Sequence, residues 1–474
     1  MQLQGYVDGL AKRGLTVYGT VVRQHNREIA SHYWRADERI NIHSLSKSFL
    51  SCAVGIAIDE GLMKLDDQVI SYFPEKLDAS PTPWQEKLTI RNLLTMSPGH
   101  SKGILLGDQR DALEDTDWVH YFLNYPMDFE PGTQFAYDTG ATFMCSAILQ
   151  KQSGMTALDY LKPRLFTPLG IRNPQWFTSP DGITLGGGGL HLNVKEISRF
   201  GQMLLDKGVY EGKRLVPEEY LALATRKQID NEGTPDWSQG YGFQFWRCVP
   251  EHVFRADGAF GQYGVVFEDK DTVLILQSSS SNQQEQLTCA WEALLPAITD
   301  EETLPESPMA HVLKKRLEKA EITPMLSSRN PWSEKEIEGK KFAFTEEVPG
   351  LVDFIGGVWI VAPQGGVTKT LRFEFAPEKA NLVFEQDNGE FTAEIGLQSH
   401  FTSFTLGGRT YGAVGRWRSD KRFELEVRCA ESAGGRRMIF TFDGDALTLE
   451  TESTMAISGG IADRPYKRYM LKAE

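Results

Sequence analysis

The first 300 residues alternate short apolar runs with longer stretches that have helical spacing. Residues 16–22 (TVYGTVV) and 272–277 (TVLILQ) are rich in β-branched and aliphatic residues, which is typical of core strands. Apolar residues at helical spacing fill four stretches between them: residues 46–60, 142–152, 194–206 and 216–225. Strands at both ends with helices between them predict an α/β domain whose two ends meet in one sheet.

From residue 341 onward the apolar residues recur with period two. In residues 422–429 (RFELEVRC), the apolar residues fall on one face of an extended chain and the charged residues on the other. Turn signals recur at Asn388-Gly389, Gly407-Gly408, Gly434-Gly435 and Asp443-Gly444. This pattern predicts an antiparallel meander or barrel of about eight short strands.

A proline-rich stretch separates the two patterns. Residues 296–340 contain five prolines and, between them, the charged segment 311–319 (HVLKKRLEK). We therefore expect a first domain over residues 1–298, a linker with one short helix over residues 299–340, and an all-β, barrel-like domain over residues 341–474.

Composition and charge narrow the classes of partner. With 474 residues, 41% of them hydrophobic, the chain can bury a sizeable core. Its net charge of -14 repels phosphate backbones, so we expect no nucleic-acid partner. The five cysteines are scattered and lack C-x-x-C spacing, which argues against a disulfide framework and a zinc site.

The sequence also bears on location. It begins without the basic and apolar segments of a signal peptide, and it has no run approaching the ~20 apolar residues of a membrane span. As written, the chain is expected to be cytoplasmic, unless an export segment precedes it.

The segment of residues 41–61 (NIHSLSKSFLSCAVGIAIDEG) carries the clearest candidate chemistry. After Ser44 it is helical in pattern and almost wholly apolar, so Lys47 should be desolvated, which lowers the pKa of its amine. Ser44 precedes Lys47 by three residues and sits where the helix dipole favours an oxyanion. The pair could be a serine nucleophile with an amine base. It could also be a capping serine followed by a surface lysine.

Other segments give this pair a context. They are residues 88–100 (LTIRNLLTMSPGH), 131–137 (PGTQFAY) and 186–190 (GGGGL). Together with S-x-x-K at Ser44 and Lys47, they resemble the serine β-lactamase and penicillin-binding-protein superfamily, most closely its class C β-lactamase-related branch. The resemblance covers roughly residues 10–295. It implies a β-lactamase/transpeptidase-like antiparallel sheet flanked by helices, and a hydrolase that needs no cofactor.

The resemblance also implies roles for single residues. Ser44 would be the acylated nucleophile, Lys47 its partner, and Tyr137 the phenolic base or proton shuttle. The family's strand triplet falls at Ala256-Asp257-Gly258, so the N–H of Ala259 would complete the oxyanion hole with that of Ser44. Tyr137 could instead be a core tyrosine, and Gly258 an ordinary bulge glycine.

Two positions depart from the family pattern. Thr139 stands where the family usually has asparagine, and Ala256 where a cation would bind a substrate carboxylate, an anchor worth ~1.5–3 kcal/mol. The form A-x-G-x-x-G-Q looks more like the esterase and amide-hydrolase members, including those resembling 6-aminohexanoate-dimer hydrolase. Candidate substrate contacts are Thr139, Asp257, Gly258 and Gln262. Asp257 could contact a substrate amine or simply face solvent.

We therefore expect a serine hydrolase that cleaves a small ester, an oligoamide or a D-amino-acid peptide or amide. A penicillin-binding-protein-like peptidase or weak β-lactamase is one alternative, and a non-catalytic binding or sensor module on the same fold is another. The histidines His100 and His191 lack a partner at metal-ligand spacing, so no metal is expected. The β domain resembles lipocalin-like barrels appended to some members of the superfamily and could wall the cleft or mediate a homodimer.

Overall fold

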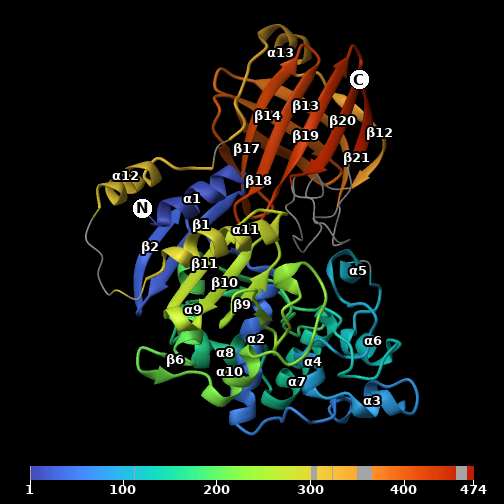
Figure 1. Cartoon of the computed structure of the whole chain (residues 1–474). Coiled ribbons are helices and arrows are strands. Elements are labelled where there is room, and N and C mark those ends of the chain that lie inside the picture. Colours follow the sequence, from blue (N-terminus) through green and yellow to red (C-terminus); the bar gives the residue numbers. More distant parts are fainter. Residues whose placement is uncertain are drawn as a thin grey trace. The chain divides into compact units, whose positions relative to one another are not determined.

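The structure is a computed structural model that describes residues 2–111, 113–299, 301, 307–322, 324–349, 366–454 and 467–474. The chain divides into two compact units, Met1–Glu321 and Ile322–Glu474 (Figure 1). The first unit is built on a six-stranded antiparallel sheet with strand order β2-β1-β11-β10-β9-β8. Its strands are β1 (Val17–Gln24), β2 (Arg27–Tyr33), β8 (Trp246–Arg247), β9 (Val253–Gly258), β10 (Gln262–Phe267) and β11 (Thr272–Ser278).

The two ends of the first domain meet as the sequence predicts. Strand β1 pairs with β11, and Val22 lies opposite Leu274. Short strand pairs complete the unit: β3 (Ile40–Asn41), β4 (Gln175–Trp176), β5 (Leu190–Leu192), β6 (Val209–Tyr210) and β7 (Lys213–Arg214). The antiparallel sheet of the predicted α/β fold is confirmed.

The described helices of the first unit are α1 (Gln2–Lys12), α2 (Ser46–Asp59), α3 (Pro83–Lys87), α4 (Ile90–Leu94), α5 (Gly107–Asp111), α6 (Trp118–Asn124), α7 (Thr139–Ser153), α8 (Ala157–Leu161), α9 (Val194–Leu205), α10 (Glu218–Thr225), α11 (Gln283–Cys289) and α12 (Pro308–Leu317). Some of them cover the faces of the sheet (Figure 1). Helix α9 packs against β1, β10 and β11. A Cβ on Gly201 would lie 2.6 Å from Val273, so glycine permits this close packing. Residues of α1 and α11 share a second apolar cluster with β11.

The predicted helices are all present, with shifted ends. Helix α7 begins at Thr139, three residues earlier than the apolar pattern indicates, because the side chain of Asp138 caps it and accepts a hydrogen bond from Ala141 N. Helix α10 begins at Glu218, directly after Pro217. The apolar pattern therefore locates these helices better than it locates their first turns.

The second unit is a β-barrel. Its strands are β12 (Phe342–Pro349), β13 (Val367–Phe375), β14 (Lys379–Gln386), β15 (Gly389–Gly396), β16 (Thr402–Leu406), β17 (Arg409–Ser419), β18 (Arg422–Cys429), β19 (Gly435–Asp443), β20 (Ala446–Ser453) and β21 (Lys467–Ala473). Strand β15 pairs with β17 at Gly396 and Val414, which closes a ring of nine of these strands and leaves β16 outside it. The predicted barrel-like domain is confirmed, and the β15–β17 pairing joins strands that an open meander would leave apart.

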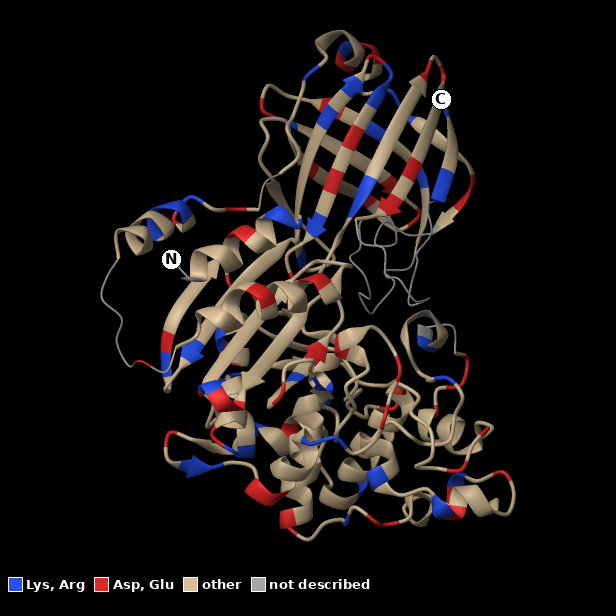
Figure 2. Ribbon diagram, viewed as in Figure 1, with Lys and Arg blue, Asp and Glu red and all other residues tan. Residues whose placement is uncertain are grey.

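Aromatic side chains fill the barrel core. Phe373 lies 5.0 Å from Phe440 and 5.6 Å from Phe423, measured between ring centroids, and all three are buried. Charged residues of both signs recur along the strands between these apolar positions (Figure 2). The period of two in the sequence thus corresponds to a packed interior and a charged exterior.

The stretch predicted as a linker contains two helices. Helix α12 belongs to the first unit, where Arg316 forms an ion pair with Asp8. Helix α13 (Pro331–Ile337) belongs to the second unit, where Ser333 Oγ donates to the Asp420 carbonyl at 2.6 Å. Each helix therefore makes contacts within its own unit.

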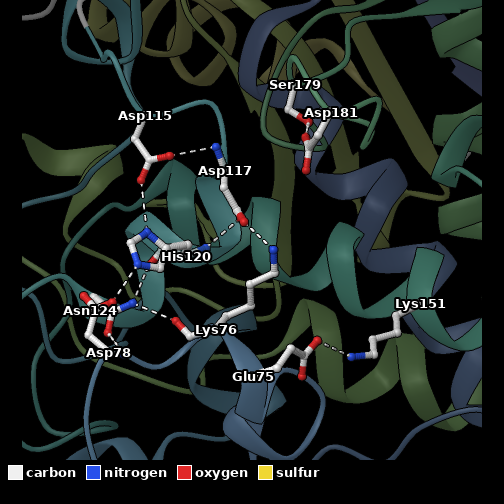
Figure 3. A network of polar contacts seen from close by, with 10 residues as sticks. All are labelled: Glu75, Lys76, Asp78, Asp115, Asp117, His120, Asn124, Lys151, Ser179 and Asp181. Atoms are coloured by element: carbon white, nitrogen blue, oxygen red, sulfur yellow. Dashed lines mark hydrogen bonds and ion pairs between the residues drawn. The ribbon is translucent and has the colours of Figure 1, made fainter.

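In the first unit, a polar network connects α6 with the 3-10 turn Pro74–Lys76, which is distant from α6 in sequence (Figure 3). His120 contacts Asp78 through Nε2 at 3.0 Å and Asp115 through Nδ1 at 3.1 Å. Both ring nitrogens can donate only when the imidazole is protonated, and these hydrogen bonds raise the pKa of His120 above 6.5.

Replacing His120 with glutamine is therefore expected to destabilise the protein more in mild acid than in mild base. A raised pKa in the folded state contributes stability that is fully present below the unfolded pKa of 6.5 and is lost as pH rises through the folded value. Melting temperatures of wild type and His120→Gln at about pH 5.5 and about pH 8.5 measure this. An equal loss at both values would contradict a charged His120.

Candidate active site

Ser44 lies in a short 3-10 turn, His43–Leu45, that leads directly into α2. His43 adopts a left-handed backbone conformation with φ of 50°, and its N–H donates to Asn41 Oδ1 at 2.9 Å. Strand β9 packs closely on this turn, since a Cβ on Gly258 would lie 2.2 Å from the Ile42 carbonyl oxygen. The structure thus gives Gly258 a packing role that brings the end of β9 beside Ser44.

Lys47 is buried beside Ser44 on the first turn of α2. Its Nζ donates to the Gly187 carbonyl at 2.6 Å, to Thr139 Oγ1 at 3.2 Å and to Ser44 Oγ at 3.4 Å. Burial lowers the pKa of Lys47 to about 7, with Asp138 opposing the shift and Arg110 adding to it. Near neutral pH the amine is thus available in both its neutral and its charged form.

Tyr137 completes the group around Ser44. Its ring centroid lies 5.0 Å from Lys47 Nζ, and its ring stacks on that of Trp246 at 5.6 Å. Burial raises the pKa of Tyr137 well above its ordinary value, while a hydrogen bond with Ser44 opposes the shift. The phenol therefore stays protonated at neutral pH and can donate a proton. The structure brings the predicted Ser44, Lys47 and Tyr137 together.

A buried aspartate–histidine pair supports this arrangement. Asp138 lies between Tyr137 and Thr139, is fully buried, and contacts His100 Nδ1 at 2.6 Å. Because Asp138 also caps α7, it fixes the chain at the point where Tyr137 and Thr139 turn toward Lys47. Sequence reasoning considered His100 only as a metal ligand. The aspartate directly before a helix was the signal that could have pointed to this pair.

The remaining predicted residues lie on β9, on the turn that follows it and at the start of β10. Ala259 is half-buried at the start of this turn, where Phe260 has φ of 68°. Gln262 is buried, and its Nε2 donates to the Ser278 carbonyl at 2.7 Å, which ties β10 to the end of β11. Asp257 is buried with Arg255, so the solvent-facing alternative for Asp257 is wrong.

Gly187 offers a way to test the position of Lys47. A Cβ at Gly187 would lie 2.6 Å from Thr139 Cγ2 and 3.1 Å from Lys47 Nζ, whereas one at Gly188 would make only ordinary contacts at 3.9 Å. We expect Gly187→Ala to lower kcat on an ester by about 10²-fold, a typical cost of misplacing a catalytic group.

The matched variant Gly188→Ala should retain most of the wild-type rate. Both rates are measured on folded protein whose circular dichroism matches that of wild type. Equal rates in the two variants would show that catalysis does not depend on the position of the Lys47 amine.

In the parts of the chain that the structure describes, no cluster of His, Cys, Asp or Glu has the arrangement of a metal site. Among the same residues, no helix is long and apolar enough to cross a membrane.

The chain is similar to two named enzymes over part of its length. The 6-aminohexanoate-dimer hydrolase of Paenarthrobacter ureafaciens is 25% identical over 277 residues, which is 53% of this chain and 70% of that protein. Lovastatin esterase of Penicillium rubens is 25% identical over 203 residues, 35% of this chain. The chain spans only 51% of the length of that esterase.

One solved structure matches almost the whole chain. The octameric penicillin-binding protein homologue from Pyrococcus abyssi covers 99% of this chain, with all of its own length matched, at 16% identity and a TM-score of 0.51. At this identity the match establishes the fold alone. The family model described as Beta-lactamase matches residues 4–297, which contain every candidate residue of the site. The chain therefore belongs to the Beta-lactamase family, and it has the spacing S-x-x-K at Ser44 and Lys47.

Proposed function

We propose that this protein is a serine hydrolase that cleaves an ester or amide through an acyl-enzyme on Ser44. The observation that carries the proposal is the convergence of two different proton-transfer groups on one hydroxyl. Lys47 Nζ lies 3.4 Å from Ser44 Oγ, and Tyr137 is hydrogen-bonded to the same residue. A capping serine would need neither neighbour.

The pKa shifts support different tasks for the two groups. Neutral Lys47, with a pKa of about 7, takes the proton from Ser44 as Oγ attacks the carbonyl carbon. Tyr137, whose pKa is raised, gives its proton to the leaving oxygen or nitrogen and is reprotonated by the Lys47 ammonium. Water then attacks the acyl-enzyme by the reverse sequence, which restores Ser44.

Backbone donors would stabilise the tetrahedral intermediate. Ser44 sits just before α2, and β9 packs on its turn through Gly258, so the N–H groups of Ser44 and Ala259 are the proposed oxyanion hole. Removing one such donor typically costs about 10²–10³-fold in kcat.

The substrate is an ester or amide without a required carboxylate. Ala256 stands where a cation would anchor such a group, and it is buried in β9. The names of the two relatives, an amide-dimer hydrolase and an esterase, support the same class. A β-lactam would lose a charge-assisted hydrogen bond of ~1.5–3 kcal/mol, so we expect β-lactams to be poor substrates.

A substrate panel tests the proposal. Wild type and Ser44→Ala are compared on p-nitrophenyl acetate, a linear 6-aminohexanoate dimer, a D-amino-acid p-nitroanilide and nitrocefin. We expect wild type to turn over at least one ester or amide faster than nitrocefin, and Ser44→Ala to turn over none. Equal turnover by both proteins would contradict the proposal. Absence of turnover together with binding would favour a non-catalytic module.

A further inference from the structure

A buried carboxylate lies at the edge of the proposed site. Asp257 is on β9, two residues before the proposed oxyanion donor Ala259, and its side chain is 6% exposed. Arg255 Nε donates to Asp257 Oδ2 at 2.8 Å. Among the described residues, no other donor contacts this carboxylate. The second oxygen, Oδ1, therefore keeps its capacity to accept a hydrogen bond.

Arg255 is locked in place and is not accessible to a substrate. Its Nη1 donates to the carbonyls of Asp236 at 2.8 Å and Arg247 at 3.1 Å, and its side chain is 0% exposed. The guanidinium also lies over the ring of Trp237, 4.6 Å from the centroid. Burial raises the pKa of Asp257 to about 6, and Arg255 opposes this shift, so the carboxylate is ionised near neutral pH while no cation is presented to the site.

Aromatic rings join this ion pair to Tyr137. Trp246 stacks on Tyr137 at 5.6 Å and has the Arg255 guanidinium 5.6 Å from its centroid. Tyr241 packs on Trp246 at 4.8 Å, and Phe135 lies 5.3 Å from Tyr241. Phe135 and Tyr137 are partly exposed, whereas Tyr241 and Trp246 are buried; we call this group of four rings the aromatic wall.

The position of Asp257 relative to Tyr137 indicates which part of a substrate it would meet. The Trp246 ring lies 5.6 Å from that of Tyr137 and 5.6 Å from the Arg255 guanidinium, whose Nε donates to Asp257. The ion pair is therefore connected to the Tyr137 side of Ser44 through Trp246. Since Tyr137 is the proposed proton donor to the leaving group, this is the leaving-group side.

We infer that Asp257 and the aromatic wall form a leaving-group subsite for a cation, so that esters or amides of ammonium-bearing alcohols or amines are the preferred substrates. A carboxylate oxygen beside aromatic faces is a recognised chemistry for binding ammonium groups. The same negative charge repels a leaving group that bears a carboxylate. This inference rests on the proposed hydrolase function and specifies its substrate class.

Three thioesters whose leaving groups carry a positive charge, no charge or a negative charge test the inference, and the first two have the same shape. They are acetylthiocholine, its neutral isostere S-(3,3-dimethylbutyl) thioacetate, and S-acetyl-3-mercaptopropionate, with the released thiol followed colorimetrically. The protein's own described cysteines are buried, which keeps the background low. We expect kcat/KM for the cationic thioester to exceed that for the neutral one by about tenfold, and the anionic one to be the poorest.

Matched variants assign the preference to Asp257. Asp257→Asn should bring the cationic-to-neutral ratio close to one. Asp230→Asn removes the same charge from a side chain that is 89% exposed, and it should leave the ratio unchanged. If Asp257→Asn folds poorly, the double variant Arg255→Met/Asp257→Asn removes both charges and should show the same loss of preference.

A binding measurement tests the inference even where turnover is too slow to measure. Choline should slow the labelling of Ser44 by a fluorophosphonate in wild type, and 3,3-dimethylbutanol should not. Labelling of Ser44 without any charge discrimination, or a preference that survives in Asp257→Asn, would overturn the inference alone. Absence of both labelling and turnover would overturn the proposed function and the inference with it.

Discussion

Replacing Lys47 with methionine is expected to lower kcat/KM on esters by about 10³–10⁴-fold, the upper range for loss of a general base. Methionine matches the buried stem of lysine but cannot accept the Ser44 proton. It also removes the hydrogen bonds to the Gly187 carbonyl and Thr139. The measurement is steady-state kinetics on folded protein, with the exposed Lys64→Met as the control.

The pH dependence of the wild-type enzyme provides a second readout of Lys47. Because only the neutral amine accepts a proton, kcat/KM should rise with pH through an apparent pKa of about 7 and fall steadily below it. The Lys47→Met variant should lose this acid limb. Activity above a tenth of wild type in Lys47→Met, or an acid limb centred near pH 4, would contradict its role as the base.

Removing Arg255 alone is expected to cause the largest loss of stability. Arg255→Met leaves the Asp257 carboxylate buried without its partner, and such a broken pair typically costs about 3–5 kcal/mol. The double variant Arg255→Met/Asp257→Asn should recover a large part of this loss, because no uncompensated charge remains. Urea unfolding of wild type, the single variant and the double variant measures the free energy of unfolding for each.

The relative stabilities of the three proteins show whether Arg255 and Asp257 are electrostatically coupled. If Asp257 is held ionised by Arg255, the single variant is the least stable of the three proteins. A single variant as stable as wild type would mean that the buried pair is not electrostatically coupled. It would also weaken the case for a charged leaving-group subsite.

Much of the fold follows from periodicity and turn chemistry. The apolar strands of residues 16–22 and 272–277 do meet in one sheet as β1 and β11, and the period-two region forms a barrel. The closure of the barrel could not be predicted, because the pairing of β15 with β17 joins Gly396 and Val414 through tertiary contacts that no local pattern encodes.

The candidate site was predictable only where local spacing carries the chemistry. Ser44 and Lys47 lie three residues apart on one helical turn, so their contact follows from helix geometry. The Gly187 carbonyl that accepts from Lys47 is 140 residues away in sequence, and His100 is 38 residues from Asp138. Such long-range partners depend on the packing of loops, which periodicity does not specify.

The burial of Asp257 also depends on residues that are distant in sequence, so it could not be predicted. Alternation along β9 puts Arg255 and Asp257 on one face, but their burial depends on Trp237 and Trp246, which belong to other segments. The sequence therefore left a choice between a solvent-facing and a substrate-facing aspartate. The structure replaces the first alternative with a buried ion pair.

Direct detection of the acyl-enzyme tests the central claim. Wild type and Ser44→Ala are mixed with a slowly hydrolysed p-nitrophenyl ester, quenched in acid within the burst, and analysed by intact and peptide mass spectrometry. We expect one acyl group per wild-type chain, located on Ser44, and none on Ser44→Ala. An unmodified wild-type chain during turnover, or the same acylation in Ser44→Ala, would contradict it.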